Sequence, residues 1–293
     1  MIEVISSGIT LLQDSGRAGF QSFGVGSSGA WDQINYRLVA NLLDETNPTV
    51  FEIIRGRFEF HSSSKILLAV IGAAVVESNG QKLSLNTLLE INADSKILIT
   101  PSSDSPVYLG ISGLSAKKIL GSSATDTLSG LGPKQVTHGE KFEIAGKSSA
   151  QIGSFIQKMP RIDPVVIRFV RGPHFQELPQ IIEVQAIART GVRFQTKLNS
   201  TLSTLPSFPV FPGVIQLTPN GELIALGVDC GTTGGYPAVG VIIESDLAKL
   251  ARHTQSQKIR LIEISPDEAN TISKQLAKEV AKAVINPANF GAW

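Results

Sequence analysis

The feature that most constrains the fold of this chain is a recurrence of short apolar runs separated by turn-forming residues. Each run has the length of a β-strand rather than that of a long helix. Regular spacing of such runs is typical of β-barrels and β-sandwiches, so we expect a mainly β chain with few helices. The runs cover residues 65–71, 95–100, 106–112, 165–170, 214–218, 222–228, 238–243 and 258–264.

Three local signals predict a hairpin and two helices. Residues 219–221, Pro-Asn-Gly, tolerate the positive backbone angles of a tight hairpin. Asp32 is placed to cap a helix that ends near Leu43 and has one apolar face. A second helix is expected after Ser265, because Glu268 follows three residues later and completes a capping box.

Composition narrows the classes of partner. The 293 residues are 42% hydrophobic, which supports a full core, and carry 26 Lys and Arg against 25 Asp and Glu. This balance gives no basic field, so we expect no nucleic-acid partner. The most apolar stretch, residues 65–76, is too short to cross a membrane. The single Cys230 and four scattered histidines predict a reduced, metal-free protein. Residues 1–10 carry no secretory signal, so we expect a cytoplasmic protein.

A less patterned stretch over residues 146–163, which begins with Lys and Ser and contains Pro, is the expected domain boundary. It divides the chain into a first domain over residues 1–150 and a second over residues 160–293, which carries the C-terminal helix. Each part has an ordinary domain size. No repeat in the sequence is strong enough to establish that the two parts share a fold.

The densest polar cluster lies between Asp14 and Asp32. Five glycines there indicate tight turns whose backbone amides are open to an anionic or carbonyl group. Arg17 adds a planar fork suited to a carboxylate or a carboxyphosphate. The alternative interpretation is a surface crossover in which Asp14 and Arg17 form an ordinary ion pair and Asp32 only caps a helix.

A second cluster, residues 228–237, lies between two predicted strands. The hydroxyls of Thr232, Thr233 and Tyr236 offer a hydrogen-bonding wall without a titrating base. No lysine follows the glycines, so the segment is not a phosphate loop of the nucleotide-hydrolase type. A plain strand-to-strand turn explains the cluster about equally well.

Two single residues remain open candidates. Cys230 has no adjacent base and is best explained as a buried small hydrophobe rather than a nucleophile. Glu52 stands among apolar neighbours that could raise its proton affinity, although an exposed strand position explains it equally well.

Taken together, the motifs resemble the family that holds the C subunit of 5-oxoprolinase, allophanate hydrolase subunit 2 and the Kip-type antagonist protein. This family is related to the biotin-dependent carboxyltransferase region of urea amidolyase. Several motifs in the right order are far more specific than any one of them. The matching residues are 13–17, 19–21, 24–25, 28–32, 41–43 and Glu52 in the first part, and 212–216, 219–221 and 232–237 in the second.

The resemblance implies two cyclophilin-like β-barrel domains and a role as one member of a complex. The chain is expected to act with a Kip-inhibitor-like B subunit and a third subunit, opening the lactam of 5-oxoproline to glutamate at the expense of ATP. ATP binds the complex, in this chain or in a partner. Relatives of the urea amidolyase type carboxylate urea instead, but no biotin-carrier lysine motif is present here, so we do not expect biotin.

The resemblance also assigns candidate residues, which are expected to face one another across a groove between the domains. Four positions depart from the family's polar pattern, which leaves open a degenerate binding or regulatory subunit of the Kip type. The departures are Ala188, Phe208, Cys230 and Gly231. The catalytic candidates are Asp14, Arg17, Asp32, Glu52 and Arg189, and the substrate-binding candidates are Ser28, Gln216, Asp229, Thr232, Thr233, Gly235 and Tyr236.

Overall fold

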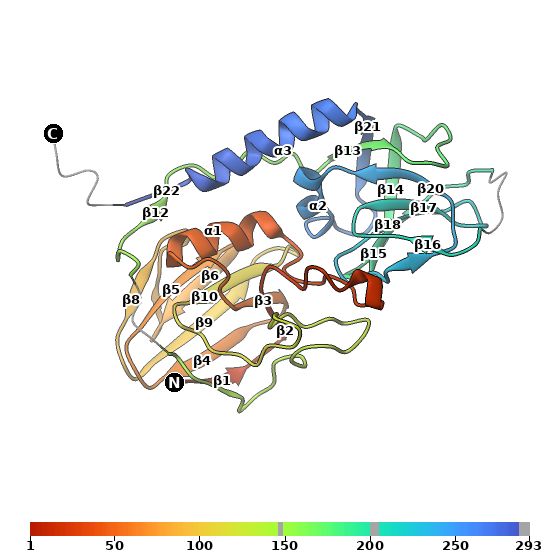
Figure 1. Ribbon diagram of the computed structural model, residues 1–293. Coiled ribbons are helices and arrows are strands. Elements are labelled where there is room, and N and C mark those ends of the chain that lie inside the picture. The colour runs from red at the N-terminus through yellow and green to blue at the C-terminus, as the bar shows by residue number, and fades with distance from the viewer. Residues whose placement is uncertain (146–148, 200–204, 287–293) are drawn as a thin grey trace.

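The computed structural model describes residues 1–145, 149–199 and 205–286 (Figure 1). Part of the predicted boundary, residues 146–148, and the last residues of the predicted second domain, 287–293, lie outside the described residues. Strands dominate, with three α-helices and one short 3₁₀ helix in the part of the chain described. The expectation of a mainly β chain with few helices is confirmed.

The first half consists of two sheets that enclose one core. One sheet has the order β11-β1-β4-β9-β6-β7, and the other has the order β2-β3-β10-β5-β8. In β4 every second residue is fully buried, so Phe58 and Phe60 enter the core. The strands are β1 (Ile2–Ser6), β2 (Ile9–Gln13), β3 (Val50–Arg55), β4 (Phe58–Ser62), β5 (Ile66–Ile71), β6 (Ala74–Ser78), β7 (Gln81–Lys82), β8 (Leu89–Ile91), β9 (Ser95–Pro101), β10 (Val107–Ile111) and β11 (Lys141–Phe142).

Helix α1 (Gln33–Leu43) covers the second sheet and begins where the sequence indicated. The Asp32 carboxylate accepts hydrogen bonds from the amides of Ile34 and Asn35 at 3.1 and 3.0 Å, as an N-cap does. The helix approaches β10 closely at Gly110, where an added Cβ would lie 2.3 Å from a methyl group of Val39. This close contact seals the outer face of the sheet.

The second half contains a closed barrel with the order β13-β20-β17-β18-β15-β14-β21. The predicted hairpin is confirmed: β17 and β18 pair antiparallel, and Gly221 adopts a φ of 78° in the turn. A separate two-stranded sheet pairs β16 with β19 beside the barrel. The strands are β13 (Val166–Arg171), β14 (Ile181–Ala188), β15 (Gly191–Gln195), β16 (Phe208–Pro209), β17 (Val214–Leu217), β18 (Leu223–Leu226), β19 (Thr233–Gly234), β20 (Ala238–Ile242) and β21 (Lys258–Glu263).

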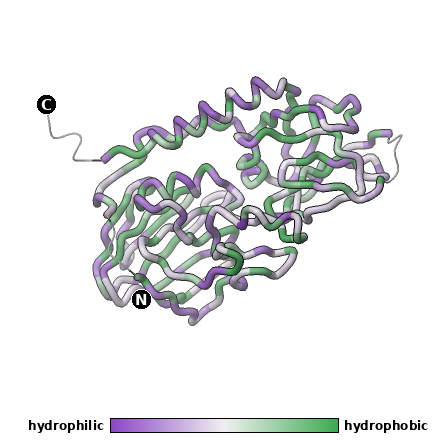
Figure 2. Tube along the Cα trace, in the orientation of Figure 1, coloured by the Kyte–Doolittle hydropathy of each residue, from purple (hydrophilic) through white to green (hydrophobic). Residues whose placement is uncertain are grey.

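Two helices follow the barrel strands: α2 (Glu244–Leu250) and α3 (Pro266–Ala281). The capping box predicted at Ser265 and Glu268 is present. Helix α3 then runs from the barrel back across the first half, with hydrophilic residues along much of its length (Figures 1 and 2).

The chain after α3 returns to the first half. There β22 (Val284–Ile285) pairs with β12 (Phe155–Ile156), the strand that leads into the barrel. Val280 and Ala283 pack into the same apolar cluster as α1. Residues 280–285 of the predicted second domain therefore pack against the first half.

Candidate functional site

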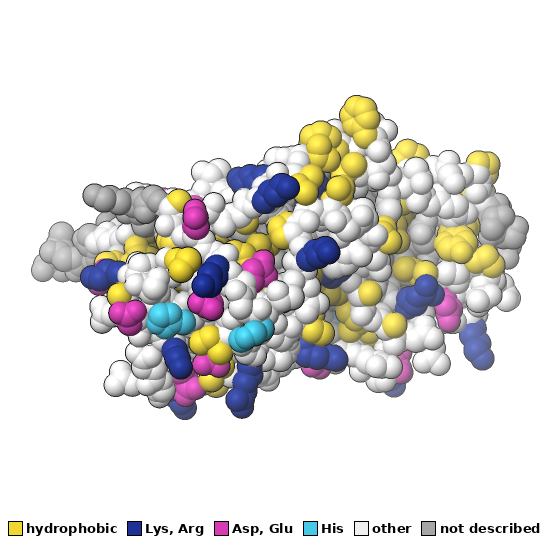
Figure 3. Space-filling view, turned by 90° about the horizontal axis from the view of Figure 1, so that it is seen from below, with side chains coloured by type: hydrophobic (Ala, Val, Ile, Leu, Met, Phe, Trp, Pro, Cys, Tyr) yellow, Lys and Arg dark blue, Asp and Glu magenta, His cyan; other side chains and the backbone are white. Residues whose placement is uncertain are grey.

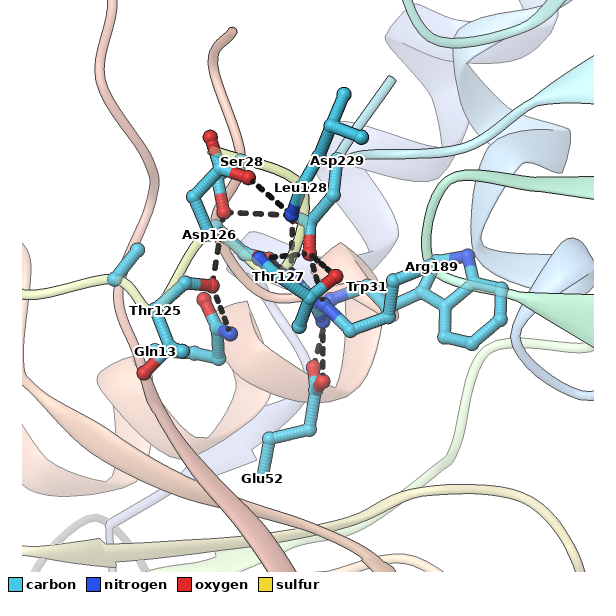
Figure 4. Close-up of polar contacts among 12 residues, drawn as sticks. Gln13, Ser28, Trp31, Glu52, Thr125, Asp126, Thr127, Leu128, Arg189 and Asp229 are labelled. Atoms are coloured by element: carbon cyan, nitrogen blue, oxygen red, sulfur yellow. Dashed lines mark hydrogen bonds and ion pairs between the residues drawn. The ribbon is translucent and has the colours of Figure 1, made fainter. Parts of the chain in front are cut away.

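The most extensive buried polar network joins the two halves through Arg189, which directly follows β14 (Figure 4). Only 5% of this residue is exposed. Its Nε donates to Asp229 at 2.8 Å, and its Nη2 donates to Asp229 at 3.0 Å and to the carbonyl of Gly29 at 2.7 Å. Its Nη1 donates to Glu52 on β3. All three guanidinium nitrogens are therefore engaged.

Asp229, which follows β18, gathers donors from both halves of the chain. Ser28 Oγ donates to it at 2.7 Å, and the amide and hydroxyl of Thr127 donate at 3.0 and 2.7 Å. Burial acts to raise the pKa of this carboxyl, but the hydrogen bonds and charge of Arg189, together with Thr127, bring the pKa below its ordinary value. Asp229 is therefore held as a carboxylate.

Glu52 is fully buried on the first-half side of the network. It accepts hydrogen bonds from the Trp31 amide at 2.8 Å and from the Tyr108 hydroxyl at 2.6 Å, besides its ion pair with Arg189. The pKa of Tyr108 lies well above its ordinary value because of burial and of the neighbouring Glu52 carboxylate. An exposed strand position is thus wrong for Glu52.

Asp14 and Arg17 do not form the ion pair considered above, because no salt bridge joins these two described residues. Asp14 instead accepts from the hydroxyl of Ser122 at 2.6 Å and from the amide of Ser123 at 2.7 Å. Arg17 donates to the carbonyls of Ile119 and Ala124. Both side chains are buried and fasten the loop of residues 119–132 to the glycine-rich segment.

Asp32 has a second contact in addition to its role as a cap. Its Oδ2 accepts from Nε of Arg252 at 2.7 Å, and Nη2 of the same guanidinium lies 2.6 Å from this oxygen. Arg252 lies just beyond α2, so this ion pair also joins the first half to the second. The interpretation of Asp32 as a cap is confirmed, and the ion pair gives it a further structural role.

The second glycine-rich cluster lies at the edge formed by β16 and β19. Thr233 and Tyr236 are exposed there, whereas Thr232 and Gly235 are half-buried. Gln216 is 5% exposed and donates to the carbonyl of Tyr236 at 3.4 Å. The structure thus brings Ser28, Glu52, Arg189 and Asp229 together in one buried network. Thr233 and Tyr236 do not belong to that network and are exposed.

Several residues of the network were not identified from the sequence. Thr127, Tyr108 and Arg252 are directly bonded to candidate residues but belong to none of the matching motifs. The available signal was a dense group of Ser, Thr and Asp over residues 122–129, within a region that has no predicted strand. Such a group indicates local hydrogen bonding without revealing its partner.

The four departures from the family pattern occupy two kinds of environment. Ala188 and Gly231 are exposed, and the Phe208 ring lies 5.6 Å from the His174 ring. Cys230 is buried, and burial raises the pKa of its thiol to about 12. The interpretation of Cys230 as a buried small hydrophobe is confirmed, because a thiol of this pKa is not a thiolate at neutral pH.

Five surface cavities lie around α3 and along β13, β20 and β21, and none of the candidate residues lines them. Within the described residues, no group of three His, Cys, Asp or Glu side chains is arranged to hold a metal ion. Over the same residues, no helix is long and apolar enough to span a membrane. Glu52, Arg189 and Asp229 are themselves at most 5% exposed, so the network between the halves is closed off from solvent at these side chains.

Residues 23–263 match the model of the carboxyltransferase domain family, subdomain A and B. The chain belongs to this family. It is also similar to the C subunit of 5-oxoprolinase from Escherichia coli strain K12, with 28% identity over 92% of this chain and 93% of that protein. For the same subunit from Haemophilus influenzae, the identity is 24% over 90% of this chain and 91% of the relative.

Solved structures show the same fold. The urea amidolyase of Kluyveromyces lactis matches with a TM-score of 0.84 and 21% identity, over 95% of this chain but 20% of that protein. The urea carboxylase of the same organism matches with a TM-score of 0.82 and 21% identity, over 95% of this chain and 29% of the other. These likenesses confirm the predicted mainly β fold, which in this chain includes a closed seven-stranded barrel in the second half. The assignment of both halves as cyclophilin-like barrel domains stays a prediction.

Proposed function

We propose that this protein is the C subunit of an ATP-dependent 5-oxoprolinase-type complex, which opens the lactam of 5-oxoproline to give glutamate. It acts with a Kip-inhibitor-like B subunit and a third subunit. The observation that carries the proposal is similarity over almost the whole length of two proteins named as this subunit of 5-oxoprolinase. Similarity of this extent covers both halves and the network that joins them.

The geometry supports a role within a complex rather than catalysis by the isolated chain. Arg189, Glu52 and Asp229 are buried and bonded to one another, so none of them presents a free group to a substrate. The exposed hydroxyls of Thr233 and Tyr236 are the candidate groups most accessible to a lactam amide. A neighbouring subunit is then needed to supply the base and enclose the site.

The candidate residues of this chain are not suited to bind a nucleoside triphosphate. Neither glycine-rich segment, 14–32 or 229–237, contains a lysine. Arg17 and Arg189 donate to carbonyl and carboxylate oxygens of the chain itself. Since triphosphates are bound through cations and free backbone amides, we assign ATP to a partner protein of the complex.

The test is reconstitution with the partner subunits, measuring glutamate release in the presence of 5-oxoproline and ATP. We expect omission of this chain to abolish turnover. Thr233→Val and Tyr236→Phe should each lower kcat/KM on the order of tenfold, the usual scale for one substrate hydrogen bond. Ser102→Ala, also at an exposed position, serves as the control. Full turnover without this chain would refute its proposed place in the complex.

A second candidate is a binding or regulatory subunit of the Kip type, favoured by the closed network and by the apolar or small residues at Ala188 and Gly231. In that case the chain alters the ATPase rate of its partners without contributing to lactam opening. Glutamate release that requires this chain, while the ATPase rate of the partners with 5-oxoproline is the same with and without it, would exclude the regulatory role alone. Carboxyl transfer to urea is tested in the same assay by replacing 5-oxoproline with urea, carboxybiotin being supplied.

A further inference from the structure

A groove outside the candidate site runs between residues 157–161 and α3; we call it the linker groove. It comprises two adjoining cavities of about 340 and 450 Å³, which share Arg161, Gln275 and Glu279 in their walls. Residues 157–161 follow β12, at the point where the chain leaves the first half for the barrel. The groove is therefore built by the segment that connects the two halves and by the helix that returns along it.

The walls of the larger cavity are strongly basic. Lys158 and Arg161 come from the connecting segment, Lys278 comes from the last turn of α3, and Lys282 is the residue that follows this helix. None of these four cations has an ion-pair partner among the described residues. Glu279 is the one carboxylate that lines this cavity within the described chain, and it accepts a hydrogen bond from Gln275.

The smaller cavity has a buried cationic floor. Lys249 is 3% exposed, and its Nζ lies 2.9 Å from Asp246 and 2.6 Å from the carbonyl of Val166. Arg168 binds the same Asp246 through Nε at 3.0 Å and Nη2 at 2.6 Å. One buried carboxylate is thus shared by two cations. Asp163 also lines this cavity, but it is exposed and therefore screened by water.

Ordinary structural roles account for only part of this arrangement. Lysines near the end of a helix interact favourably with its dipole, which explains Lys278 and Lys282. That effect does not explain Lys158 and Arg161, which lie on the connecting segment. Lys249 lies in the last turn of α2, where the helix dipole favours a cation, but burial of a cation is costly unless a full counter-charge accompanies it, and Asp246 is shared with Arg168.

We propose that the linker groove binds an acidic peptide segment of a partner protein, with one carboxylate directed toward Lys249 and Arg168. The proposal rests on the proposed function only in naming that partner as another subunit of the complex. An extended segment fits better than a single small anion, because unpaired cations continue from the smaller cavity into the larger one. Charge complementarity of this kind favours association and its specificity.

The first experiment uses a fluorescently labelled peptide of eight glutamates and measures anisotropy on addition of the full chain. We expect saturable binding that weakens with salt, because screening reduces attraction between exposed charges. The variant with K158E, R161E, K278E and K282E should bind at least about tenfold more weakly. The milder K278Q and K282Q variant should show a smaller loss, which guards against misfolding of the fourfold variant.

The control carries reversed charges elsewhere: K117E and K118E lie at exposed positions of the first half. This control should bind the peptide as the wild type does. Equal binding by all variants, or no binding by the wild type, would overturn the proposal. Binding of free inorganic phosphate in place of the peptide, with the same loss in the variants, would also overturn it in favour of a small-anion site.

The second experiment asks whether the partner belongs to the complex. With the B subunit and the third subunit present, the fourfold variant should copurify less and support less glutamate release than the K117E and K118E control. If the wild type fails to assemble at all, the proposed function fails, while the peptide measurement still decides on the groove. If the fourfold variant assembles and turns over normally, the groove is not where the subunits meet.

Discussion

Arg17 and Arg189 are both buried, but only the charge of Arg189 is neutralised by neighbouring carboxylates. Arg189 lies between two carboxylates and joins the barrel to the first half. Arg17 has no carboxylate within ion-pair distance in the described chain and donates to two backbone carbonyls, while its Nη1 has no partner. The resemblance assigns both arginines as catalytic candidates, so the same assignment does not imply the same physical role.

This difference indicates at which residues a substitution destabilises the fold most. Loss of one partner from a compensated buried cluster leaves unpaired charges, which is costly. Loss of an uncompensated cation removes a charge that was unfavourable in the first place and leaves two carbonyls without a donor. We therefore expect the Arg189 contacts to hold the two halves together. The Arg17 contacts should only fix the position of the loop of residues 119–132.

The largest expected effect is that of Arg189→Ala. The change leaves Glu52 and Asp229 buried without their cation, and we expect a loss of about 3–5 kcal/mol in the free energy of unfolding. Urea unfolding followed by tryptophan fluorescence measures it, because Trp31 is 5% exposed in the folded chain and its backbone amide donates to Glu52. Arg193→Ala, in a side chain that is 53% exposed, should cost less than about 0.5 kcal/mol. Equal midpoints for the two variants would remove the contrast between the regions.

The pH dependence of stability sharpens the comparison. The pKa of Asp229 is lower in the folded chain than in the unfolded chain, where an Asp titrates at about 3.9. The unfolded chain then binds more protons in this range, so the contribution of Asp229 is present above that pH and is lost as pH falls through the folded pKa.

Thermal unfolding between pH 7 and pH 3 tests this expectation. Asp229→Asn should cost about 1–3 kcal/mol at pH 7 and unfold with a weaker pH dependence than the wild type. Asp94→Asn, in a side chain that is 82% exposed, should follow the wild-type curve. Parallel curves for Asp229→Asn and the wild type would contradict the assignment of acid sensitivity to the Arg189 region.

A smaller effect is expected for Arg17→Met, a change that keeps the apolar stem and removes the charge. We expect the free energy of unfolding to fall by about 1 kcal/mol, the net value of ordinary hydrogen bonds. Loosening of residues 119–132 should instead appear as faster cleavage by trypsin after Lys117 and Lys118, which are exposed. A loss as large as that of Arg189→Ala would show that the two arginines are equivalent after all.

The smallest expected effect is on the reactivity of Cys230, the residue after Asp229. Because burial raises the pKa of its thiol to about 12, alkylation by iodoacetamide at pH 8 should be slow in the folded wild type. Arg17→Met should leave the rate unchanged, whereas Arg189→Ala should raise it. Rapid alkylation of the wild type would contradict burial of this thiol.

Much of the fold could be predicted from local pattern. The apolar runs became strands, and the side chains of Asp32 and Ser265 capped the expected helices. The pattern failed for two-residue strands such as β16 and β19, which are too short to show alternation. It also failed for α2, whose N-cap residue Ile243 makes no side-chain capping bond.

The candidate site was only partly predictable. The family resemblance assigned Arg189 and Glu52 as separate candidates, but their contact joins residues 137 positions apart. No spacing rule connects a residue at the end of one strand to another in a different sheet. Thr127 was missed for the same reason, since its partner Asp229 lies 102 positions away. The catalytic and substrate-binding roles of these residues stay predictions.

The pairing of β12 with β22 has a mechanical consequence. The segment into the barrel and the segment out of it lie side by side, so the barrel is attached through two adjacent tethers rather than one. A single tether lets a domain swivel freely, whereas two restrict it to rocking about the line that joins them. The chain between β12 and β22, which includes the barrel, is one long loop whose two ends are paired. Much of the conformational entropy of closing that loop is therefore lost once for the whole barrel. Exchange of the barrel between two copies of the chain would require both tethers to separate together.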